Sequence, residues 1–470
     1  MIQERNDWVD TFKRVHFVGI GGYGMSALAK IMLQMGYIVT GSDLKESQIT
    51  RKLEEIGVKI DYFHGPDNIK GADLVVYSTA IPSNNSEIMA ARERGIPLWH
   101  RSELLACLIN SKYGIAVAGT HGKTTTTSMI SLVMEKADLD PTAVIGGELT
   151  DFDGNARLGK SHYLVAEACE SDHSFLRYKP AVAVITNVEA DHLEHYGGSF
   201  RKIKETYEKF LQNIKEGGLA IICADDPHLK IMREKYSLEC ITYGIKKSAD
   251  FLAAEIYYKD GGSAFNVYFK GVKMGRVELN VPGEHNVYNA LAAIAVARLL
   301  GVSFQRAAQI LKEFKGAKRR FQIVYEGEGV TIVDDYAHHP TEIRATLSAA
   351  RSWGKRRIIA VFQPHRYSRT YYLFNNFVRS FREADVVVIS PIYAAGEKPM
   401  GGVSSDLLVE RIREEEDRDV ILLDTIEEIE KYLFRIVRPG DMIITMGAGD
   451  IWRVAYTLAG KLEKVHSESR

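Results

Sequence analysis

One ten-residue run, residues 117–126, most constrains the fold of this chain. It reads Val-Ala-Gly-Thr-His-Gly-Lys-Thr-Thr-Thr and predicts a strand that breaks into a glycine turn and then enters a helix. Backbone N–H groups of such a turn close around an oligophosphate, Lys123 adds a positive charge, and the Thr124 hydroxyl suits Mg²⁺ at the helix N-terminus. The run predicts an ATP-binding loop of Gly119, Thr120, His121, Gly122, Lys123, Thr124 and Thr125.

This loop is shorter than the usual G-x-x-x-x-G-K-[ST] form. In that form the first glycine would fall at Val117, whereas Gly119 comes only three residues before Gly122. The strand-turn-helix context, with a lysine leading into the helix, still favours phosphate binding over a glycine turn without a ligand.

Length and charge limit the other classes of function. The chain has 470 residues and is 46% hydrophobic, which is too long for one compact core and favours three domains. Lys and Arg number 60 against 61 Asp and Glu, so no overall field attracts nucleic acid or an anionic membrane. The start lacks an apolar signal core, and Arg298 interrupts the apolar run 291–297. We expect a cytoplasmic protein without membrane insertion, either a monomer or a homodimer.

The four cysteines are scattered along the chain. No C-x-x-C pair occurs, which argues against a disulfide framework and a zinc knuckle. We predict that they are packing residues: Cys107, Cys169, Cys223 and Cys240.

A second glycine pattern opens the chain. Residues 15–24 read as a buried strand running into Gly19-x-Gly21-x-x-Gly24, with a helix from Met25 to Met35. Asp43 follows about twenty residues later, at the end of the next strand, as expected for a bound dinucleotide. Taken alone, the pattern predicts NAD, although the same turn suits any diphosphate.

Alternating strands and helices divide the chain into three α/β domains. Strands at 37–40 and 73–77 belong to a first domain, 1–105. Strands at 114–118, 163–166, 181–185 and 219–222, an antiparallel portion at 250–281 and a helical pair at 286–314 form a central domain, 106–317. Strands at 330–333, 358–362, 386–389 and 442–445 form a third, 318–470.

Polar residues at the predicted strand ends of the central domain suit a metal and a base. Glu167 and His192 each follow a strand near Lys123, and with Thr124 they are candidate Mg²⁺ ligands, although Mg²⁺ prefers oxygen to imidazole. Asn286 and Asn289 lie one helical turn apart and could read a base, with helix capping at Asn286 as the alternative.

The third domain carries two polar clusters directly after strands. They are residues 334–341, which include two histidines, and residues 363–370, which include Arg366 and Arg369. Planar guanidinium groups suit a carboxylate or phosphate, so these clusters are expected to face a cleft. Two phosphate loops in successive domains point away from hydride transfer and toward a phosphate-rich substrate that meets a nucleoside triphosphate.

These motifs together resemble the Mur ligases of peptidoglycan synthesis, and the resemblance runs almost end to end. The short loop also resembles the family's own form. The motifs in family order are Gly19-Ile20-Gly21-Gly22-x-Gly24-Met25-Ser26, residues 119–124, Glu167-Ala168-x-Glu170-Ser171-Asp172, Thr186-Asn187, Asp191-His192, His285-Asn286-x-x-Asn289, Arg319-Arg320-Phe321, Asp335-Tyr336-x-His338-His339-Pro340-Thr341-Glu342 and residues 363–367.

The resemblance implies an α/β fold with an N-terminal Rossmann-like domain for a UDP-sugar, a central P-loop ATPase-type domain and a C-terminal Rossmann-like domain that closes over ATP. It also implies a reaction. The lactyl carboxylate of UDP-N-acetylmuramate attacks the γ-phosphate of ATP, and L-alanine then attacks the resulting acyl phosphate, giving an amide, ADP and phosphate. Each like-charge pair at about 4 Å costs on the order of 4 kcal/mol at an effective dielectric of about 20, which Lys123 and Mg²⁺ would offset.

The resemblance assigns roles to residues of this sequence. It implies catalytic roles for Lys123, Glu167, His192, Arg320 and Asp335, and metal binding by Thr124, Glu167 and His192. ATP would also contact Asn286, Asn289 and Arg320. The UDP-sugar would contact Gly19, Ile20, Gly21, Gly22, Gly24, Met25, Asp43 and Ser78. The amino acid would contact Tyr336, His338, His365, Arg366 and Arg369.

Three departures and three rivals accompany this interpretation. Cys169 replaces the family's usual Asp, Ala337 a common Gly, and Pro391 stands where an acidic residue is common. The main rival is the ligase that recycles a tripeptide onto the same sugar nucleotide, which differs in its C-terminal motif. The second rival, an NAD-dependent oxidoreductase, would give Lys123 and Glu167 no role. The third, a non-catalytic regulatory relative, should have lost Lys123 or Glu167, and this chain keeps both.

Overall fold

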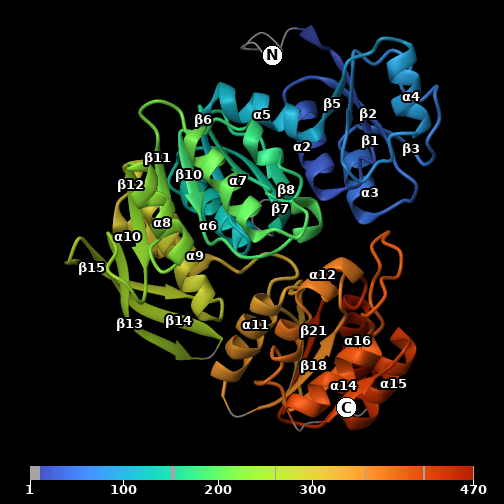
Figure 1. The fold of residues 1–470 in the computed structure, drawn as a ribbon, viewed down its shortest axis with the longest axis vertical. Coiled ribbons are helices and arrows are strands. Elements are labelled where there is room, and N and C mark those ends of the chain that lie inside the picture. The colour runs from blue at the N-terminus through green and yellow to red at the C-terminus, as the bar shows by residue number, and fades with distance from the viewer. Residues whose placement is uncertain (1–10, 150–153, 260, 355, 417–418, 469–470) are drawn as a thin grey trace.

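The computed structural model describes residues 11–149, 154–259, 261–354, 356–416 and 419–468. Three β-sheets follow one another along the chain, each flanked by helices (Figure 1). The N-terminal part is blue, the central part runs from teal to yellow, and the C-terminal part is orange to red. The predicted fold class, α/β with three such units, is confirmed.

The first sheet has five parallel strands in the order β3-β2-β1-β4-β5. This order reverses direction beside β1, which places the turn after β1 at a crevice at the carboxyl edge. The elements are β1 (Arg14–Val18), α2 (Tyr23–Gln34), β2 (Ile38–Ser42), α3 (Gln48–Glu55), β3 (Lys59–Asp61), β4 (Leu74–Tyr77), α4 (Ser86–Glu93), β5 (Leu98–His100) and α5 (Arg101–Ser111).

The central sheet has ten strands in the order β15-β14-β13-β12-β11-β10-β6-β9-β7-β8. Strand β6, which leads into the phosphate loop, pairs in parallel with β10 and β9. The predicted antiparallel portion is confirmed, because β13, β14 and β15 pair antiparallel. The strands are β6 (Tyr113–Ala118), β7 (Thr142–Leu149), β8 (Gly154–Arg157), β9 (Tyr163–Glu167), β10 (Val182–Ile185), β11 (Leu219–Cys223), β12 (Cys240–Gly244), β13 (Phe251–Lys259), β14 (Gly262–Phe269) and β15 (Val272–Leu279).

Helices cover this central sheet, and α6 and α9 pack against each other along much of their lengths. Helix α6 carries a Thr- and Ser-rich stretch that is nevertheless buried, since it lies between the sheet and α9. The helices are α6 (Lys123–Lys136), η2 (Ser174–Arg177), η3 (Leu193–Tyr196), α7 (Phe200–Gln212), α8 (Pro227–Tyr236), α9 (Glu284–Leu299) and α10 (Phe304–Glu313).

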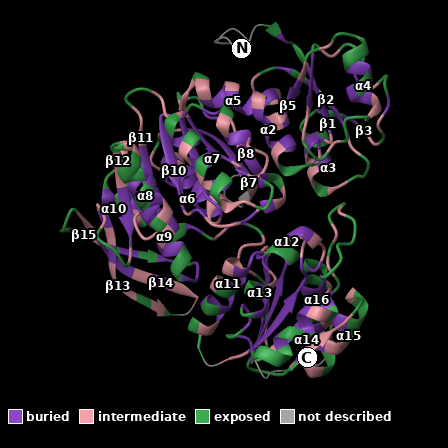
Figure 2. Cartoon of the chain, in the orientation of Figure 1, coloured by how far each residue is buried: buried purple, intermediate pink, exposed green. Residues whose placement is uncertain are grey.

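The third sheet has the order β16-β17-β21-β18-β19-β20 and is parallel except for β16. Strands β17, β18 and β21 are buried along nearly their whole length, since helices cover both faces (Figure 2). The elements are β16 (Gln322–Gly327), β17 (Val330–Asp335), α11 (Pro340–Ser352), β18 (Arg357–Phe362), α12 (Tyr367–Tyr372), α13 (Phe374–Val378), β19 (Val386–Ile389), α14 (Ser405–Glu416), β20 (Val420–Leu422), α15 (Ile426–Ile436), β21 (Asp441–Met446) and α16 (Trp452–Glu468).

Several local expectations need adjustment. The first helix begins at Tyr23 rather than Met25, because Gly22 already ends the turn. The predicted boundary at 105/106 falls inside α5, and the boundary at 317/318 falls between α10 and β16, so both remain predictions. No helix among the described residues is long and apolar enough to cross a membrane.

The packing prediction holds for Cys223, which is buried in the core, and for Cys107 and Cys240, which are partly buried and pack against it. Cys169 is also partly buried, but it lines a pocket and contacts Ser171. All four are free thiols, as the absence of a framework spacing predicted.

Candidate active site

The short phosphate loop is fixed by the loop that follows the neighbouring strand β10. Thr120 N–H donates to the Asn187 carbonyl at 3.1 Å, and His121 N–H donates to Asn187 Oδ1 at 2.8 Å. The Thr186 hydroxyl donates to the His121 carbonyl at 2.6 Å. A Cβ at Gly119 would lie 1.9 Å from Thr186 Oγ1, and its φ is +137°, so glycine is required there.

Lys123, the first residue of α6, is held by a carboxylate that the sequence analysis did not single out. Its Nζ lies 3.0 Å from both oxygens of Glu170, which is only 3% exposed, and also donates to the Gly119 and Thr120 carbonyls. Burial opposes the charge on the lysine, but Glu170 outweighs it and raises the pKa of Lys123. Lys123 is therefore a fixed positive charge inside the loop.

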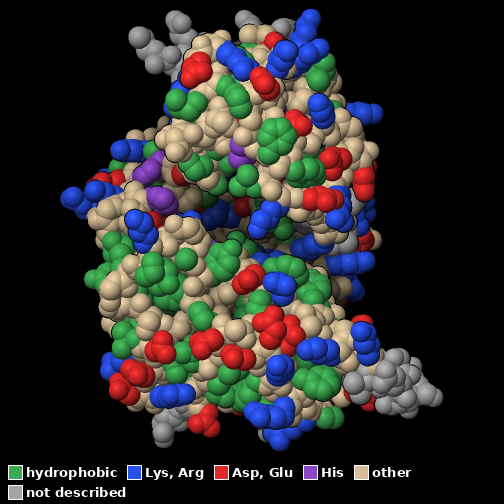
Figure 3. Space-filling view, turned by 90° about the vertical axis from the view of Figure 1, so that its right-hand side faces the viewer, with side chains coloured by type: hydrophobic (Ala, Val, Ile, Leu, Met, Phe, Trp, Pro, Cys, Tyr) green, Lys and Arg blue, Asp and Glu red, His purple; other side chains and the backbone are tan. Residues whose placement is uncertain are grey.

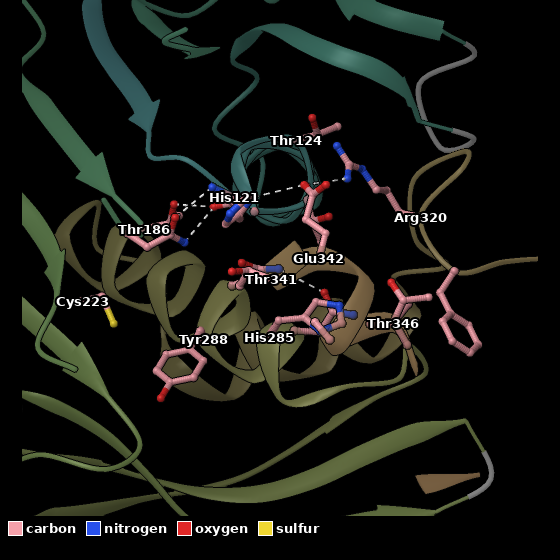
Figure 4. Close-up of a pocket in the computed structure, with 18 of the residues that line it drawn as sticks. His121, Thr124, Thr186, Cys223, His285, Tyr288, Arg320, Thr341, Glu342 and Thr346 are labelled. Atoms are coloured by element: carbon pink, nitrogen blue, oxygen red, sulfur yellow. Dashed lines mark hydrogen bonds and ion pairs between the residues drawn. The ribbon is translucent and has the colours of Figure 1, made fainter. Parts of the chain in front are cut away.

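Two adjoining pockets meet at the phosphate loop. We call the first the P-loop pocket, and it opens between α9, α11 and the loops after β6, β10 and β11. Figure 4 shows this pocket, with His121 and Glu342 pointing toward one another and Arg320 on the far side of Glu342. Its lining includes the predicted ATP-binding residues His121, Gly122, Thr124, Thr125, Asn286, Asn289 and Arg320, and also Asp335.

The second pocket, which we call the interdomain cleft, is lined by all three parts of the chain. Figure 3 shows the hollow between the N-terminal part above and the C-terminal part below, with basic side chains in its depth. The cleft shares Gly122, Thr124, Arg320 and Glu342 with the P-loop pocket, so the two form one continuous site. It also includes Tyr23, Lys123, Glu167, Cys169, Asp191, His192, Tyr336, His338, His365, Arg366 and Arg369.

The predicted metal ligands all face this cleft. Glu167 is the last residue of β9 and accepts a hydrogen bond from Gly146 N–H at 2.6 Å. Burial raises the pKa of Glu167, against the lowering effects of Gly146, Lys123 and Thr124. A partly buried carboxylate at the edge of a cleft, next to a hydroxyl such as that of Thr124, suits a divalent cation. His192 stands between Asp191 and Glu194, with nitrogen–oxygen distances of 3.5 and 3.7 Å.

The two asparagines of α9 are buried and linked to the phosphate loop. Asn289 Nδ2 donates to Asn286 Oδ1 at 3.1 Å, and Asn289 Oδ1 accepts from the Thr126 hydroxyl at 3.0 Å. The alternative of helix capping at Asn286 is wrong, because α9 begins at Glu284 with Gly283 as its cap. Asn286 Nδ2 instead donates to the Pro282 carbonyl at 2.7 Å.

Most of the residues predicted for the UDP-sugar lie in the turn after β1 or at the start of α2, while Asp43 and Ser78 follow β2 and β4. Gly19 and Ile20 donate their N–H groups to the Ser42 carbonyl at 2.8 and 2.9 Å. Asp43 accepts from Gly21 N–H at 2.8 Å, so its carboxylate holds the turn itself. Met25 and Ile20 are buried, whereas Ser78 is half-buried just after β4. Gly22 and Gly24 complete the turn, and Tyr23 between them reaches the interdomain cleft.

Asp335 ends β17 and anchors the segment that carries Arg320. Its carboxylate accepts from Phe321 N–H at 2.9 Å, Ala337 N–H at 2.7 Å and the Thr346 hydroxyl at 3.2 Å. Burial raises the pKa of Asp335 to about 6, although Arg320 and these backbone donors favour its charged form. Arg320 lies 3.6 Å from Glu342 and over the Tyr336 ring at 5.3 Å.

A buried ion pair joins the central and C-terminal parts at this cleft. Arg369 Nε donates to Asp191 Oδ1 at 2.9 Å, and both side chains are nearly inaccessible, at 3% and 6% exposed. Burial opposes ionisation of Asp191, but Arg369 holds its pKa well below the usual value. Arg369 Nη1 also donates to the His365 carbonyl at 3.3 Å. All three guanidinium nitrogens of Arg369 are thus bonded within the protein.

Arg366 is more accessible than Arg369. Its Nη1 lies 3.6 Å from both Glu194 and Glu397, and its side chain is 31% exposed. His365 stacks on Tyr393, with ring centroids 5.6 Å apart, and His338 lies beside His365. Burial is the main cause that lowers the pKa of His338 and of His365 to about 3, so both are neutral at neutral pH.

A second link crosses the same interface at His121. Its Nδ1 lies 3.3 Å from Glu342 Oε1 and its Nε2 lies 3.5 Å from Glu189 Oε2. The Thr341 hydroxyl donates to Glu189 at 2.6 Å. Burial opposes the charge, but Glu189 and Glu342 raise the pKa of His121 to about 9. Glu342 lay within a quoted motif and Glu189 between two of them, but nothing in the sequence indicated that they face the same histidine.

Family comparisons agree with this arrangement. The model of the Mur ligase family catalytic domain matches residues 14–113, the Mur ligase middle domain matches 117–297, and the Mur ligase glutamate ligase domain matches 319–449. Together these matches span most of the chain. The chain belongs to the Mur ligase family.

Individual relatives cover this Mur ligase nearly end to end. A UDP-N-acetylmuramate–L-alanine ligase of Pelotomaculum thermopropionicum is 50% identical over 457 residues, 97% of this chain and 99% of the relative. One of Geobacter sulfurreducens is 47% identical over 453 residues, covering 96% and 98%. The crystal structure of the UDP-N-acetylmuramate-alanine ligase MurC from Thermotoga maritima is similar with a TM-score of 0.82 and 31% identity, covering 96% and 99%. The murein peptide ligase of Psychrobacter arcticus gives 0.70 and 27%, covering 96% and 98%.

The charge of His121 predicts a pH dependence of the stability of this Mur ligase. The folded pKa of about 9 lies above the ordinary value of 6.5, so the stabilisation is complete below pH 6.5 and is lost as the pH rises through about 9. The free energy of unfolding of wild type should exceed that of His121→Gln most at pH 6 and converge toward it by pH 10. Chemical unfolding with a chelator present measures this.

His195→Gln is the matched control, since His195 is 45% exposed and lies outside this link. Its stability should follow that of wild type in parallel over the whole pH range. If the difference in unfolding free energy between wild type and His121→Gln does not change with pH, the charged state assigned to His121 is contradicted.

Proposed function

We propose that this Mur ligase joins L-alanine to the lactyl carboxylate of UDP-N-acetylmuramate. ATP is the energy source, an acyl phosphate is the intermediate, and UDP-N-acetylmuramoyl-L-alanine, ADP and phosphate are the products. The observation that carries the proposal is the set of full-length relatives of the alanine-adding ligase at 45–50% identity. The higher TM-score to MurC than to the murein peptide ligase, 0.82 against 0.70, favours alanine over the tripeptide.

The joined pockets suit the three substrates. ATP occupies the P-loop pocket, with the adenine near Asn286 and Asn289 and the phosphates at the loop. The UDP-sugar is held by the turn after β1 and extends past Tyr23 into the interdomain cleft. L-alanine enters the cleft from the C-terminal side, beside His338, His365 and Arg366. The carboxylate and the γ-phosphate then meet where the two pockets share Thr124 and Arg320.

Positive charge at this meeting point reduces the repulsion between a carboxylate and a triphosphate. Lys123 and Arg320 are the fixed cations there, and Asp335 holds the segment that presents Arg320. Mg²⁺ would be held by Thr124 and Glu167, with His192 as a further ligand, and when bound it supplies neutralisation of phosphate charge. The placement of Thr124, Glu167 and His192 around one cleft, with Glu167 partly buried, supports this assignment.

The histidines suit the amine of the incoming amino acid. His338 Nδ1 lies 2.9 Å from the Tyr336 carbonyl and donates to it, which leaves Nε2 as an acceptor. A neutral imidazole accepts a hydrogen bond from an amine without repelling its cationic form. Arg366 provides a cation for the alanine carboxylate, and Tyr336 borders the same space. We further infer that the enzyme works in the cytoplasm as a monomer or homodimer.

The decisive test measures ADP release from ATP and Mg²⁺ with UDP-N-acetylmuramate present. L-alanine, glycine, L-serine and the tripeptide are added in turn. Release should be fastest with L-alanine, while the small amino acids differ from it by one group and by about 1–3 kcal/mol. Release with the tripeptide alone would support the recycling ligase, and no release with any of them would favour a non-catalytic relative.

Lys123→Ala should abolish ADP release because it removes the fixed charge at the phosphates. Binding of UDP-N-acetylmuramate should survive, since its turn lies in another part of the chain. Isothermal titration calorimetry with ATP and, separately, with UDP-N-acetylmuramate shows which of the two binding sites the substitution affects. Lys136→Ala, at the other end of α6, is the matched control and should keep both. If Lys123→Ala loses binding of both ATP and UDP-N-acetylmuramate, the proposal that they bind at separate sites is contradicted.

The two arginines of the C-terminal cluster should behave differently. Arg366→Ala should raise the KM for L-alanine at least tenfold and leave binding of UDP-N-acetylmuramate unchanged, because it removes the cation for the alanine carboxylate.

Arg369→Ala should lower the unfolding free energy by about 3–5 kcal/mol, because it leaves Asp191 buried without its partner. Chemical unfolding measures the free energy of unfolding of Arg369→Ala, and steady-state kinetics at saturating ATP measures the KM for L-alanine of both variants. A raised KM in Arg369→Ala with unchanged stability would instead make Arg369 a direct alanine contact.

A further inference from the structure

We propose that His121, Glu189 and His339 form a site for a zinc-class divalent cation that bridges the phosphate loop and the first helix of the C-terminal part. One ligand atom from each residue lies within 4.8 Å of the other two. His121 Nε2 and His339 Nδ1 lie 3.5 and 4.0 Å from the same oxygen, Glu189 Oε2. Ligands of a tetrahedral zinc ion, bonded at about 2.0–2.1 Å, stand roughly 3.3 Å apart, so modest side-chain shifts close the site.

The outer hydrogen bonds already orient both imidazoles. His121 Nδ1 donates to Glu342 Oε1 at 3.3 Å, and His339 Nε2 donates to the Ala190 carbonyl at 3.4 Å. Metal-binding histidines characteristically give their second ring N–H to a carboxylate or a backbone carbonyl in this way. The remaining nitrogens, His121 Nε2 and His339 Nδ1, lie on the Glu189 side, where His339 Nδ1 also accepts a hydrogen bond from Thr341 N–H at 3.3 Å that a bound cation would displace.

His121 Nε2 supplies an independent observation. This atom is buried and makes no hydrogen bond within the described part of the chain. It faces Glu189 Oε2 at 3.5 Å as an ion-pair partner and offers a lone pair to a cation only once its proton has left. Zinc would displace the proton that this nitrogen carries at neutral pH, as zinc does at other histidine sites.

The ligand set separates this site from the proposed magnesium site. Two imidazoles and one carboxylate favour Zn²⁺, Cu²⁺ or Ni²⁺, whereas Mg²⁺ prefers oxygen ligands such as Thr124 and Glu167. None of His121, Glu189 and His339 belongs to the predicted magnesium set. The two sites therefore discriminate between the two classes of cation by chemistry.

The position of the site gives it a consequence for domain closure. His121 and Glu189 follow strands β6 and β10 of the central sheet, whereas His339 caps α11 of the C-terminal part. A bound cation would tie these segments together beside the P-loop pocket, which His121, Glu189 and Glu342 line. We infer that zinc holds the closed arrangement and slows nucleotide exchange.

Direct binding tests the site without any substrate. The full-length enzyme is stripped of metal, kept in excess Mg²⁺, and titrated with Zn²⁺ against a chromophoric zinc indicator. Wild type should bind one zinc per chain, and Co²⁺ in its place should give the visible absorption of tetrahedral coordination. His339→Asn and Glu189→Gln should each weaken zinc at least tenfold, since loss of an outer partner alone costs about 10–100-fold.

Both variants are chosen to preserve local structure. Asparagine keeps the N-cap of α11 that His339 provides, and glutamine keeps an acceptor for the Thr341 hydroxyl. His195→Ala, at an exposed histidine outside the cluster, should bind zinc like wild type. Equal zinc affinity in wild type, His339→Asn and Glu189→Gln would overturn the proposal. So would binding that is lost only in His192→Ala, because zinc would then occupy the magnesium site.

Nucleotide exchange tests the bridging role. Zinc should slow release of a fluorescent ADP analogue from wild type, a chelator should reverse the effect, and His339→Asn should need at least tenfold more zinc for it. If zinc binds at the three residues but does not slow release of the ADP analogue, the bridging role is overturned and only the metal site is supported. Because neither measurement uses UDP-N-acetylmuramate or alanine, failure here is distinguishable from failure of the proposed ligase reaction.

Discussion

The buried Asp191–Arg369 ion pair is the contact on which the shape of the active site depends. Two charges removed from water are costly unless they pair with good geometry, so Asp191 and Arg369 stay together only while the central and C-terminal parts are docked. Asp191 precedes His192, and Arg369 bonds the His365 carbonyl. The pair therefore positions a candidate metal ligand on one side of the cleft and a candidate amino-acid contact on the other.

Charge in the cleft is arranged so that three of the cations predicted to act there each have a carboxylate partner within the protein. Lys123 pairs with Glu170, Arg320 with Glu342, and Arg366 with Glu194 and Glu397. Such pairing keeps the cations fixed at the loop and at the cleft wall, which is the preorganisation that an anionic reaction requires. Phosphates and substrate carboxylates then compete with protein carboxylates for cations that are already in place.

Sequence reasoning predicted those features that depend on neighbouring residues. The glycine turns, the strands and the antiparallel portion follow from local pattern, because backbone conformation and burial are properties of short segments. The pairings did not follow, because Lys123 and Glu170 are 47 residues apart and Asp191 and Arg369 are 178 apart. Which charges meet depends on strand order and domain docking, and neither can be read from the residues next to each charge in the sequence. The hydrogen bond from Gly21 N–H to the Asp43 carboxylate was not predicted either, and the contact of Asp43 with the UDP-sugar stays a prediction.

The short phosphate loop has a physical explanation in its neighbours. A longer loop satisfies its own backbone groups, whereas here Thr186 and Asn187 satisfy those of Thr120 and His121. Gly119 must lack a side chain because Thr186 lies against it. The loop and the end of β10 are therefore one unit, and the residues that follow β10 move with the phosphate site. Glu189 and Asp191 lie in that segment and contact the C-terminal part, so nucleotide binding at the loop is mechanically coupled to the docking of the C-terminal part.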